Sequence, residues 1–102
     1  MNAKQKTTAG KILKEMHETY LSRQKVYGNN YAIVGQIMPM LFPNGLMLKS
    51  PEDFEMFHLF DLLIGKLTRF TVSEMTHQDS IHDLAVYGAM VEEVLINSRR
   101  NK

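Results

Sequence analysis

Apolar residues recur at helical spacing in the first part of the chain. One side of a helical projection of residues 9–27 collects Ile12, Met16, Tyr20 and Tyr27. Gly28 and Asn29 follow, and both residue types favour the left-handed conformation in which many helices end. This pattern predicts a helix over residues 9–27. Asn30 then caps a second, shorter helix that contains Pro39 as a kink or an early stop.

Capping signals mark the start of two further helices. Ser50 and Pro51 combine an N-cap residue with a proline at the first helical position, and they predict a helix over residues 51–70. The turn signal of residues 42–45 precedes it. Ser80 and Asp83 have the spacing of a capping box, with Asp in place of the usual Glu. Apolar residues at helical spacing carry this fourth helix to about residue 97.

No segment alternates with period two for long enough to predict a strand, so we expect an all-α fold, a single domain of about four helices. Residues 1–8 are expected to form a flexible N-terminus, residues 9–97 the helical domain and residues 98–102 a basic C-terminal tail. Four short helices in 102 residues bury little apolar surface, and the eight methionines suit an adaptable interface. We therefore expect homo-oligomerisation to complete the core.

Composition and charge exclude several classes of function. Lys and Arg number 12 and Asp and Glu number 11, and the net charge of +1 argues against a broad nucleic-acid-binding surface. The absence of cysteine excludes disulfides, thiolate nucleophiles and cysteine-based zinc sites. No run of about 20 apolar residues predicts a membrane span, and no apolar signal-peptide core follows the first residues. We expect a cytoplasmic protein without a membrane partner.

Three basic residues are candidates for holding an anion. Lys66 and Arg69 lie one turn apart on the polar side of residues 51–70, where an arginine fork and a lysine ammonium can hold a phosphate together. The alternative is an ordinary solvated face, which spacing alone favours. Arg23 falls on the apolar side of residues 9–27, so we expect it to point inward. It predicts either a ligand-binding cation or a structural ion pair with Asp79 or Asp83.

Asp79 and Asp83 are also candidates for binding a metal ion. They are four residues apart, and such an acidic pair on one helix face can hold a divalent cation such as Mg²⁺. The alternative is a local role, in which Asp83 closes the capping box and Asp79 favours the helix start.

Several short motifs together resemble the nucleotide modification associated domain 1 family and related small phage and prophage proteins. The motifs are Tyr27-Gly28-Asn29-Asn30, the Lys66-x-x-Arg69 helix, and Asp79-Ser80-x-x-Asp83-Leu84-x-x-Tyr87. The resemblance implies an all-helical, phage-type protein of nucleotide metabolism or DNA-base modification. Carried over by position, it implies a shared polar set: Arg23, Lys25, Tyr27, Gly28, Asn30, Lys66, Arg69, Asp79, Asp83 and Tyr87.

A more distant similarity is to the MazG-type all-α nucleoside triphosphate pyrophosphohydrolases, whose metal-binding helix is similar in outline to residues 79–83. Those enzymes also need an inward Glu-x-x-Glu pair, and Glu15 and Glu18, which have this spacing, project toward the lysine-rich outer face of their helix. Three functions therefore stay open. The first is a protein that binds a nucleotide or a nucleotide-derived phosphate ligand, for example to sequester a nucleotide signal, without any reaction. The second is a Mg²⁺-dependent pyrophosphohydrolase, and the third is a helical interaction module with no small ligand.

Overall fold

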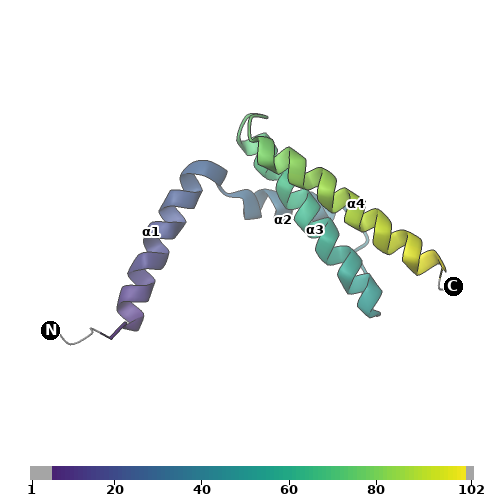
Figure 1. Cartoon of the computed structure of the whole chain (residues 1–102), viewed down its shortest axis with the longest axis horizontal. Coiled ribbons are helices and arrows are strands. Elements are labelled where there is room, and N and C mark those ends of the chain that lie inside the picture. The colour runs from purple at the N-terminus through teal and green to yellow at the C-terminus, as the bar shows by residue number, and fades with distance from the viewer. Residues whose placement is uncertain (1–5, 101–102) are drawn as a thin grey trace.

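The chain folds into four helices, as the sequence predicts. The computed structural model describes residues 6–100, and all side chains in that range except those of residues 26, 27, 99 and 100. The helices are α1 (Ala9–Tyr27), α2 (Asn30–Leu41), α3 (Pro51–Val72) and α4 (Gln78–Arg100). The described residues include no strand, so the all-α prediction is confirmed. α3 and α4 form an antiparallel pair, α2 packs on α3, and α1 points away from the other three (Figure 1).

Local capping signals set the helix ends where the sequence predicted them. The Ser50 Oγ accepts a hydrogen bond from the Asp53 N–H at 3.1 Å, and Asp53 Oδ2 accepts one from the Ser50 N–H at 3.1 Å. This capping box starts α3, with Pro51 at the first helical position. Thr8 caps α1 by accepting a hydrogen bond from the Lys11 N–H. The predicted turn before α3 forms as well, closed by a hydrogen bond from Gly45 N–H to the Phe42 carbonyl.

Two capping predictions are wrong because the side chains make other contacts. α4 begins at Gln78, so Ser80 lies inside its first turn, where it is buried and its Oγ lies 2.6 Å from His77 Nδ1. Asp83 forms an ion pair with Lys66 instead of closing a capping box. Asn30 is the first residue of α2 and not its cap, because its side chain bonds to α3.

The ends of the helical region also differ from the expected boundaries. α4 continues to Arg100 and so includes part of the segment expected to be a tail, while α3 extends two residues beyond its expected end. Residues 1–5 of the expected N-terminal segment and residues 101 and 102 lie outside the described range.

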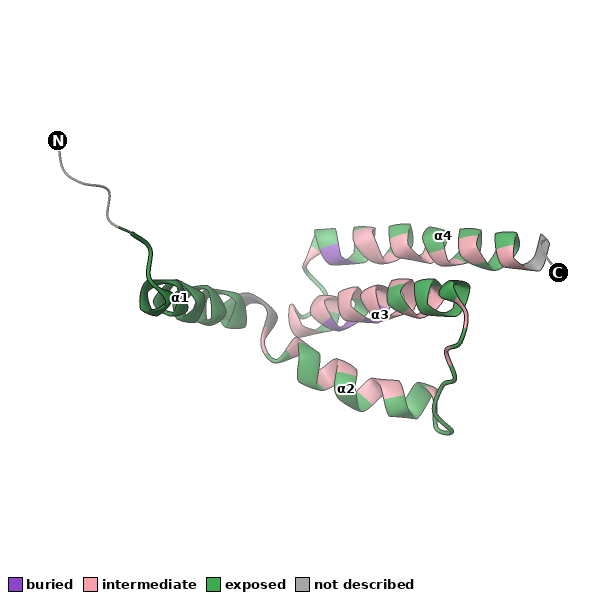
Figure 2. Ribbon diagram, turned by 90° about the horizontal axis from the view of Figure 1, so that it is seen from below, coloured by how far each residue is buried: buried purple, intermediate pink, exposed green. Residues whose placement is uncertain are grey.

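The core between α2, α3 and α4 is small and partly polar. Among the described residues, Ile64 is the one buried apolar side chain, and Thr68 and Ser80 are the two buried polar ones (Figure 2). The Thr68 hydroxyl contacts Asn30 Oδ1 and the Gly65 carbonyl, and Asn30 Nδ2 donates to that same carbonyl at 3.3 Å. These contacts join α2 to α3 and satisfy the buried polar atoms involved, as buried polar groups require.

Replacing Thr68 by valine is expected to lower the free energy of unfolding by about 1–3 kcal/mol, because Asn30 Oδ1 would lose its partner in a buried position. Thr71→Val is the matched control, since Thr71 is exposed and bonds only within its own helix. Urea denaturation of both variants measures the effect. Equal stability of the two variants would contradict a special role for the Thr68 contacts.

α1 contributes almost nothing to this core. Every described side chain of α1 is exposed, including the apolar residues of its predicted inward stripe (Figure 2). The expectation that Arg23 points into the core of its own chain is therefore wrong, because Arg23 and the other described side chains on that face of the helix are exposed. Within residues 6–100, no helix has the length and apolar character that crossing a membrane requires.

Candidate functional site

A pocket of about 520 Å³ opens where the end of α1 meets α2 and α3, beside α4. Its volume falls in the usual range for small-molecule sites, about 300–1,000 Å³. The polar and aromatic side chains that line it come from all four helices: Tyr20, Arg23, Gln24, Asn30, Tyr31, Asp61, Lys66, Arg69 and Tyr87. We call this set, with Gly28, the hinge pocket.

Apart from Gly28 and the two aspartates, the shared polar set predicts seven ligand-binding residues, and five of them line the hinge pocket: Arg23, Asn30, Lys66, Arg69 and Tyr87. The other two do not add to the described pocket. Lys25 is exposed on α1 and is not among the lining residues, and the side chain of Tyr27 lies outside the described residues. Residues far apart in sequence, from α1 and from α3, thus bring their cations to one opening.

The charge of the hinge pocket is predominantly positive. Arg23, Lys66 and Arg69 contribute three cations, and Asp61 contributes one carboxylate. Arg23 is exposed on α1, whereas Lys66 and Arg69 are half-buried on α3. Two guanidinium groups and one ammonium around one opening favour an anion with several oxygen atoms, such as a phosphate.

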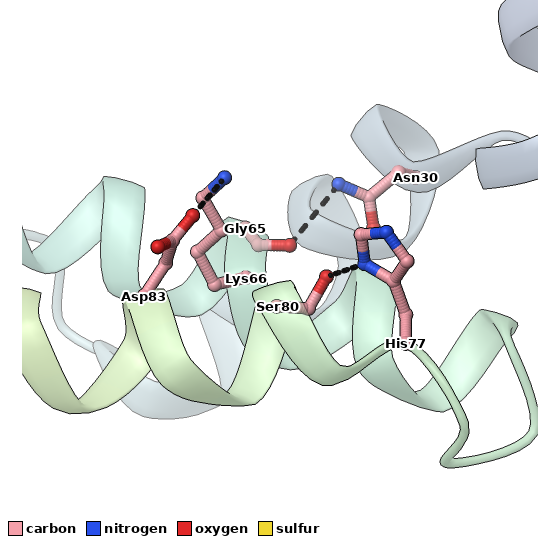
Figure 3. A network of polar contacts seen from close by, with 6 residues as sticks. All are labelled: Asn30, Gly65, Lys66, His77, Ser80 and Asp83. Atoms are coloured by element: carbon pink, nitrogen blue, oxygen red, sulfur yellow. Dashed lines mark hydrogen bonds and ion pairs between the residues drawn. The ribbon is translucent and has the colours of Figure 1, made fainter.

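Lys66 is held in place by α4. Its Nζ lies 3.1 Å from Asp83 Oδ2, with 20% of the Lys66 side chain and 41% of the Asp83 side chain exposed (Figure 3). An ion pair this exposed contributes little to stability, typically about 0–1 kcal/mol. Its consequence is positional: Asp83 orients Lys66 at the wall of the pocket and offsets part of its charge.

The structure changes the expected roles of the two aspartates. Asp83 pairs with Lys66, Asp79 is exposed, and neither pairs with Arg23, so the ion pair predicted for Arg23 is wrong. In the part of the chain that the structure describes, no three His, Cys, Asp or Glu side chains gather as metal ligands would. Because hard cations take six or more oxygen ligands, the pair alone is an incomplete protein site for Mg²⁺.

Asn30 shapes the wall of the pocket. Its Nδ2 donates to the Gly65 carbonyl (Figure 3). Its Oδ1 contacts the Thr68 hydroxyl. Both ends of the amide are thus engaged with α3. Asn30 fixes α2 beside Lys66 and Arg69, and this contact favours a positioning role over direct contact with a ligand.

Sequence patterns did not single out Tyr31 and Gln24 as lining residues, and they placed Tyr20 in an apolar stripe. Tyr31 lies on α2 with 69% of its surface exposed, next to the pocket. The apolar pattern of α2 could not identify Tyr31 as a lining residue, because the position of Tyr31 beside the pocket depends on the angle between α1 and α2.

The angle between α1 and α2 depends on Gly28. Its φ of 60° and ψ of −148° belong to a backbone region that is essentially restricted to glycine. A Cβ at this position would also lie 3.4 Å from Val72 Cγ1. Gly28 therefore sets the direction in which α1 leaves the other helices, and with it the position of Arg23.

Gly28→Ala is expected to reorient α1 while leaving the helix content of α2 to α4 unchanged. The alanine disfavours the observed backbone conformation by about 1–3 kcal/mol, and few contacts hold α1 in its place. Distances between spin labels on α1 and α3, measured by pulsed electron paramagnetic resonance, should shift. Gly35→Ala is the control, because a Cβ there meets nothing within 4 Å. An unchanged distance distribution in Gly28→Ala would contradict the role of this hinge.

The chain matches no protein-family model, and it has no significant match to a curated protein or to a solved structure.

Proposed function

We propose that this chain binds a nucleotide or a nucleotide-derived phosphate ligand in the hinge pocket. One observation carries the proposal: Arg23 from α1 and Lys66 and Arg69 from α3 line the same open pocket. Cations on a plain solvated face would instead diverge into water. In this arrangement they can share one phosphate or neighbouring phosphates, through charge-assisted hydrogen bonds that are stronger than neutral ones.

The aromatic lining supports a nucleotide among the phosphate-bearing ligands. Tyr20, Tyr31 and Tyr87 line the pocket from α1, α2 and α4. A nucleobase stacked on an aromatic ring gains about 1–3 kcal/mol. Phosphate on the basic side and a base on Tyr31 or Tyr87 would use both parts of the lining. Tyr31 is the best placed for stacking, since it is the most exposed of the three.

Binding without a reaction fits these residues better than hydrolysis. Asp83 is occupied by Lys66, and Glu15 and Glu18 lie exposed on α1. The described residues thus supply few carboxylates for the metals on which a pyrophosphohydrolase depends. The resemblance to nucleotide modification associated domain 1 proteins supports a phage-type role in nucleotide metabolism, base modification or sequestration of a nucleotide signal. We place this activity in the cytoplasm, of the host cell if a phage encodes the chain, and we infer a homo-oligomer.

Isothermal titration calorimetry of the full chain tests the proposal. The titrants are nucleoside monophosphates, nucleoside triphosphates, cyclic nucleotides and inorganic phosphate, at up to about millimolar ligand. We expect at least one nucleotide class to bind more tightly than inorganic phosphate, because only a nucleotide engages the tyrosines. Absence of binding by every titrant would overturn the proposal.

A second assay separates binding from hydrolysis. The chain is incubated with nucleoside triphosphates and Mg²⁺ or Mn²⁺, and released pyrophosphate is measured. We expect none above the buffer control. Turnover that is lost in Asp83→Asn with the helix content intact would assign the chain to the pyrophosphohydrolases instead.

A further inference from the structure

α1 is an amphipathic helix with nothing packed on its apolar side. Ile12, Met16 and Tyr20 recur every four residues along this side, and they are 41%, 59% and 48% exposed. In a monomeric protein, an apolar stripe on a 19-residue helix normally faces a core. An exposed stripe of this length indicates a surface that another structure covers. We call Ile12, Met16 and Tyr20 the α1 stripe.

The dimensions of the whole chain show how much surface is left uncovered. The radius of gyration is 18.8 Å, against about 13 Å for a compact chain of this length. The accessible surface is 8444 Å², which exceeds by about 2,500 Å² the area typical of a compact protein of 11.8 kDa. A standard interface buries about 800 Å² on each partner, and obligate dimers bury more. The excess is therefore large enough for an extensive interface.

A second unpartnered apolar surface lies at the other end of the chain. The end of α2, the linker after it and the start of α3 enclose an apolar groove of about 530 Å³. Its walls include Leu41, Phe42, Leu46, Met47, Phe57 and Phe60. The Phe42 and Phe60 rings pack edge to face with their centroids 5.6 Å apart, and they hold the linker against α3. We call these six residues the linker groove, and a helix that presents side chains at every fourth position suits such a groove.

The charges beside the two surfaces are complementary. α1 carries four cations (Lys11, Lys14, Arg23 and Lys25) and two carboxylates (Glu15 and Glu18), a balance of +2. Residues 49–55, next to the linker groove, carry Lys49 and three carboxylates (Glu52, Asp53 and Glu55), a balance of −2. Opposite charge balances favour an encounter between these two surfaces.

The two surfaces cannot meet within one chain as it is folded. α1 extends from one end of the molecule, and the linker between α2 and α3 lies toward the opposite end, in both views (Figures 1 and 2). The longest dimension of the chain is 64 Å. We propose that two copies of the chain exchange α1: the α1 stripe of each copy packs into the linker groove of the other. Such a reciprocal exchange closes with two-fold symmetry and leaves neither surface open.

Light scattering coupled to size-exclusion chromatography, with variants of the full chain, tests the exchange. The wild type should have twice the 11.8 kDa mass of the chain. Met16→Glu should be monomeric, because it places a charge in the α1 stripe. Ser22→Glu is the matched control, since it adds the same charge to the outer side of α1, and it should stay dimeric. A monomeric wild type at high concentration, or a dimeric Met16→Glu, would overturn the proposal. Circular dichroism should show equal total helix content for both variants.

Disulfide trapping identifies which two surfaces are in contact. The chain has no cysteine of its own that could form a competing disulfide. A chain with Met16→Cys is mixed with a chain with Met47→Cys under mild oxidation. The exchange predicts a covalent dimer that contains one chain of each kind. Two other products would overturn it. One is Met16→Cys linked to a second Met16→Cys, which indicates α1 packed on α1. The other is a cross-linked single chain in the doubly substituted protein, which indicates α1 folded back on its own groove.

Discussion

Ile64→Ala is expected to lower the free energy of unfolding by about 2–5 kcal/mol, the range for truncating a buried isoleucine or leucine. Ile64 is 5% exposed and lies on α3, where α3 packs against α2 and α4. Among the described residues, no other apolar side chain is buried to this extent. A domain of this size has only about 5–15 kcal/mol in total, so this one substitution removes a large share.

Leu67→Ala provides the comparison, because Leu67 lies on the same helix but is 38% exposed. Leu67→Ala should lower the free energy of unfolding clearly less than Ile64→Ala does. Chemical denaturation at one fixed protein concentration measures both variants, since self-association would make the stability depend on concentration. Equal losses for the two variants would show that the centre of the core lies elsewhere.

The second large effect is expected on ligand affinity. In Arg23→Gln/Lys66→Gln, the hinge pocket loses two of its three cations, and we expect the affinity for the best nucleotide to fall by about 100-fold. This corresponds to about 1.4 kcal/mol, or one factor of ten, for each charge. Calorimetry with the nucleotide found in the titrations measures the change. The binding of the wild type should also weaken as salt is added, because the opening is accessible to screening ions.

Asp83→Asn is expected to change the ligand affinity in the opposite direction. Its carboxylate offsets the charge of Lys66 across 3.1 Å, so its neutralisation leaves the ammonium available to the ligand. We expect affinity to rise by a few-fold in Asp83→Asn and to fall in Lys66→Gln. A loss of affinity in both variants would indicate that the ion pair itself, and not the charge of Lys66, supports the pocket.

The sequence predicted helix positions well wherever the signal was local. The capping box of Ser50 and Asp53 lies within four residues, and α3 starts there. Ser80 and Asp83 have the same spacing but do not cap, because His77 lies beside Ser80 and Lys66 reaches Asp83 from another helix. Spacing along a chain contains no information about a partner from another helix, such as Lys66.

The candidate site was predictable in its charged residues but not in its shape. Lys66 and Arg69 share a helix face, which a helical projection shows directly. That Arg23 lines the same opening depends on the backbone of Gly28, and the inward direction expected for Arg23 assumed that a single chain covers its own apolar side. In this fold the described side chains of α1 are exposed, so the periodicity identified the stripe correctly while the inward direction expected for it was wrong.

The order of the helices along the chain has a consequence for biosynthesis. α3 and α4 are neighbours joined by the five residues 73–77, and folds rich in such local contacts form within about microseconds to milliseconds. Translation proceeds at about 5–20 residues per second, so α1 is synthesised seconds before the start of α3. In the proposed exchange, the linker groove that receives α1 includes residues from the start of α3, so this groove does not exist when α1 is made. The α1 stripe would therefore be made before its binding surface and would pack after it.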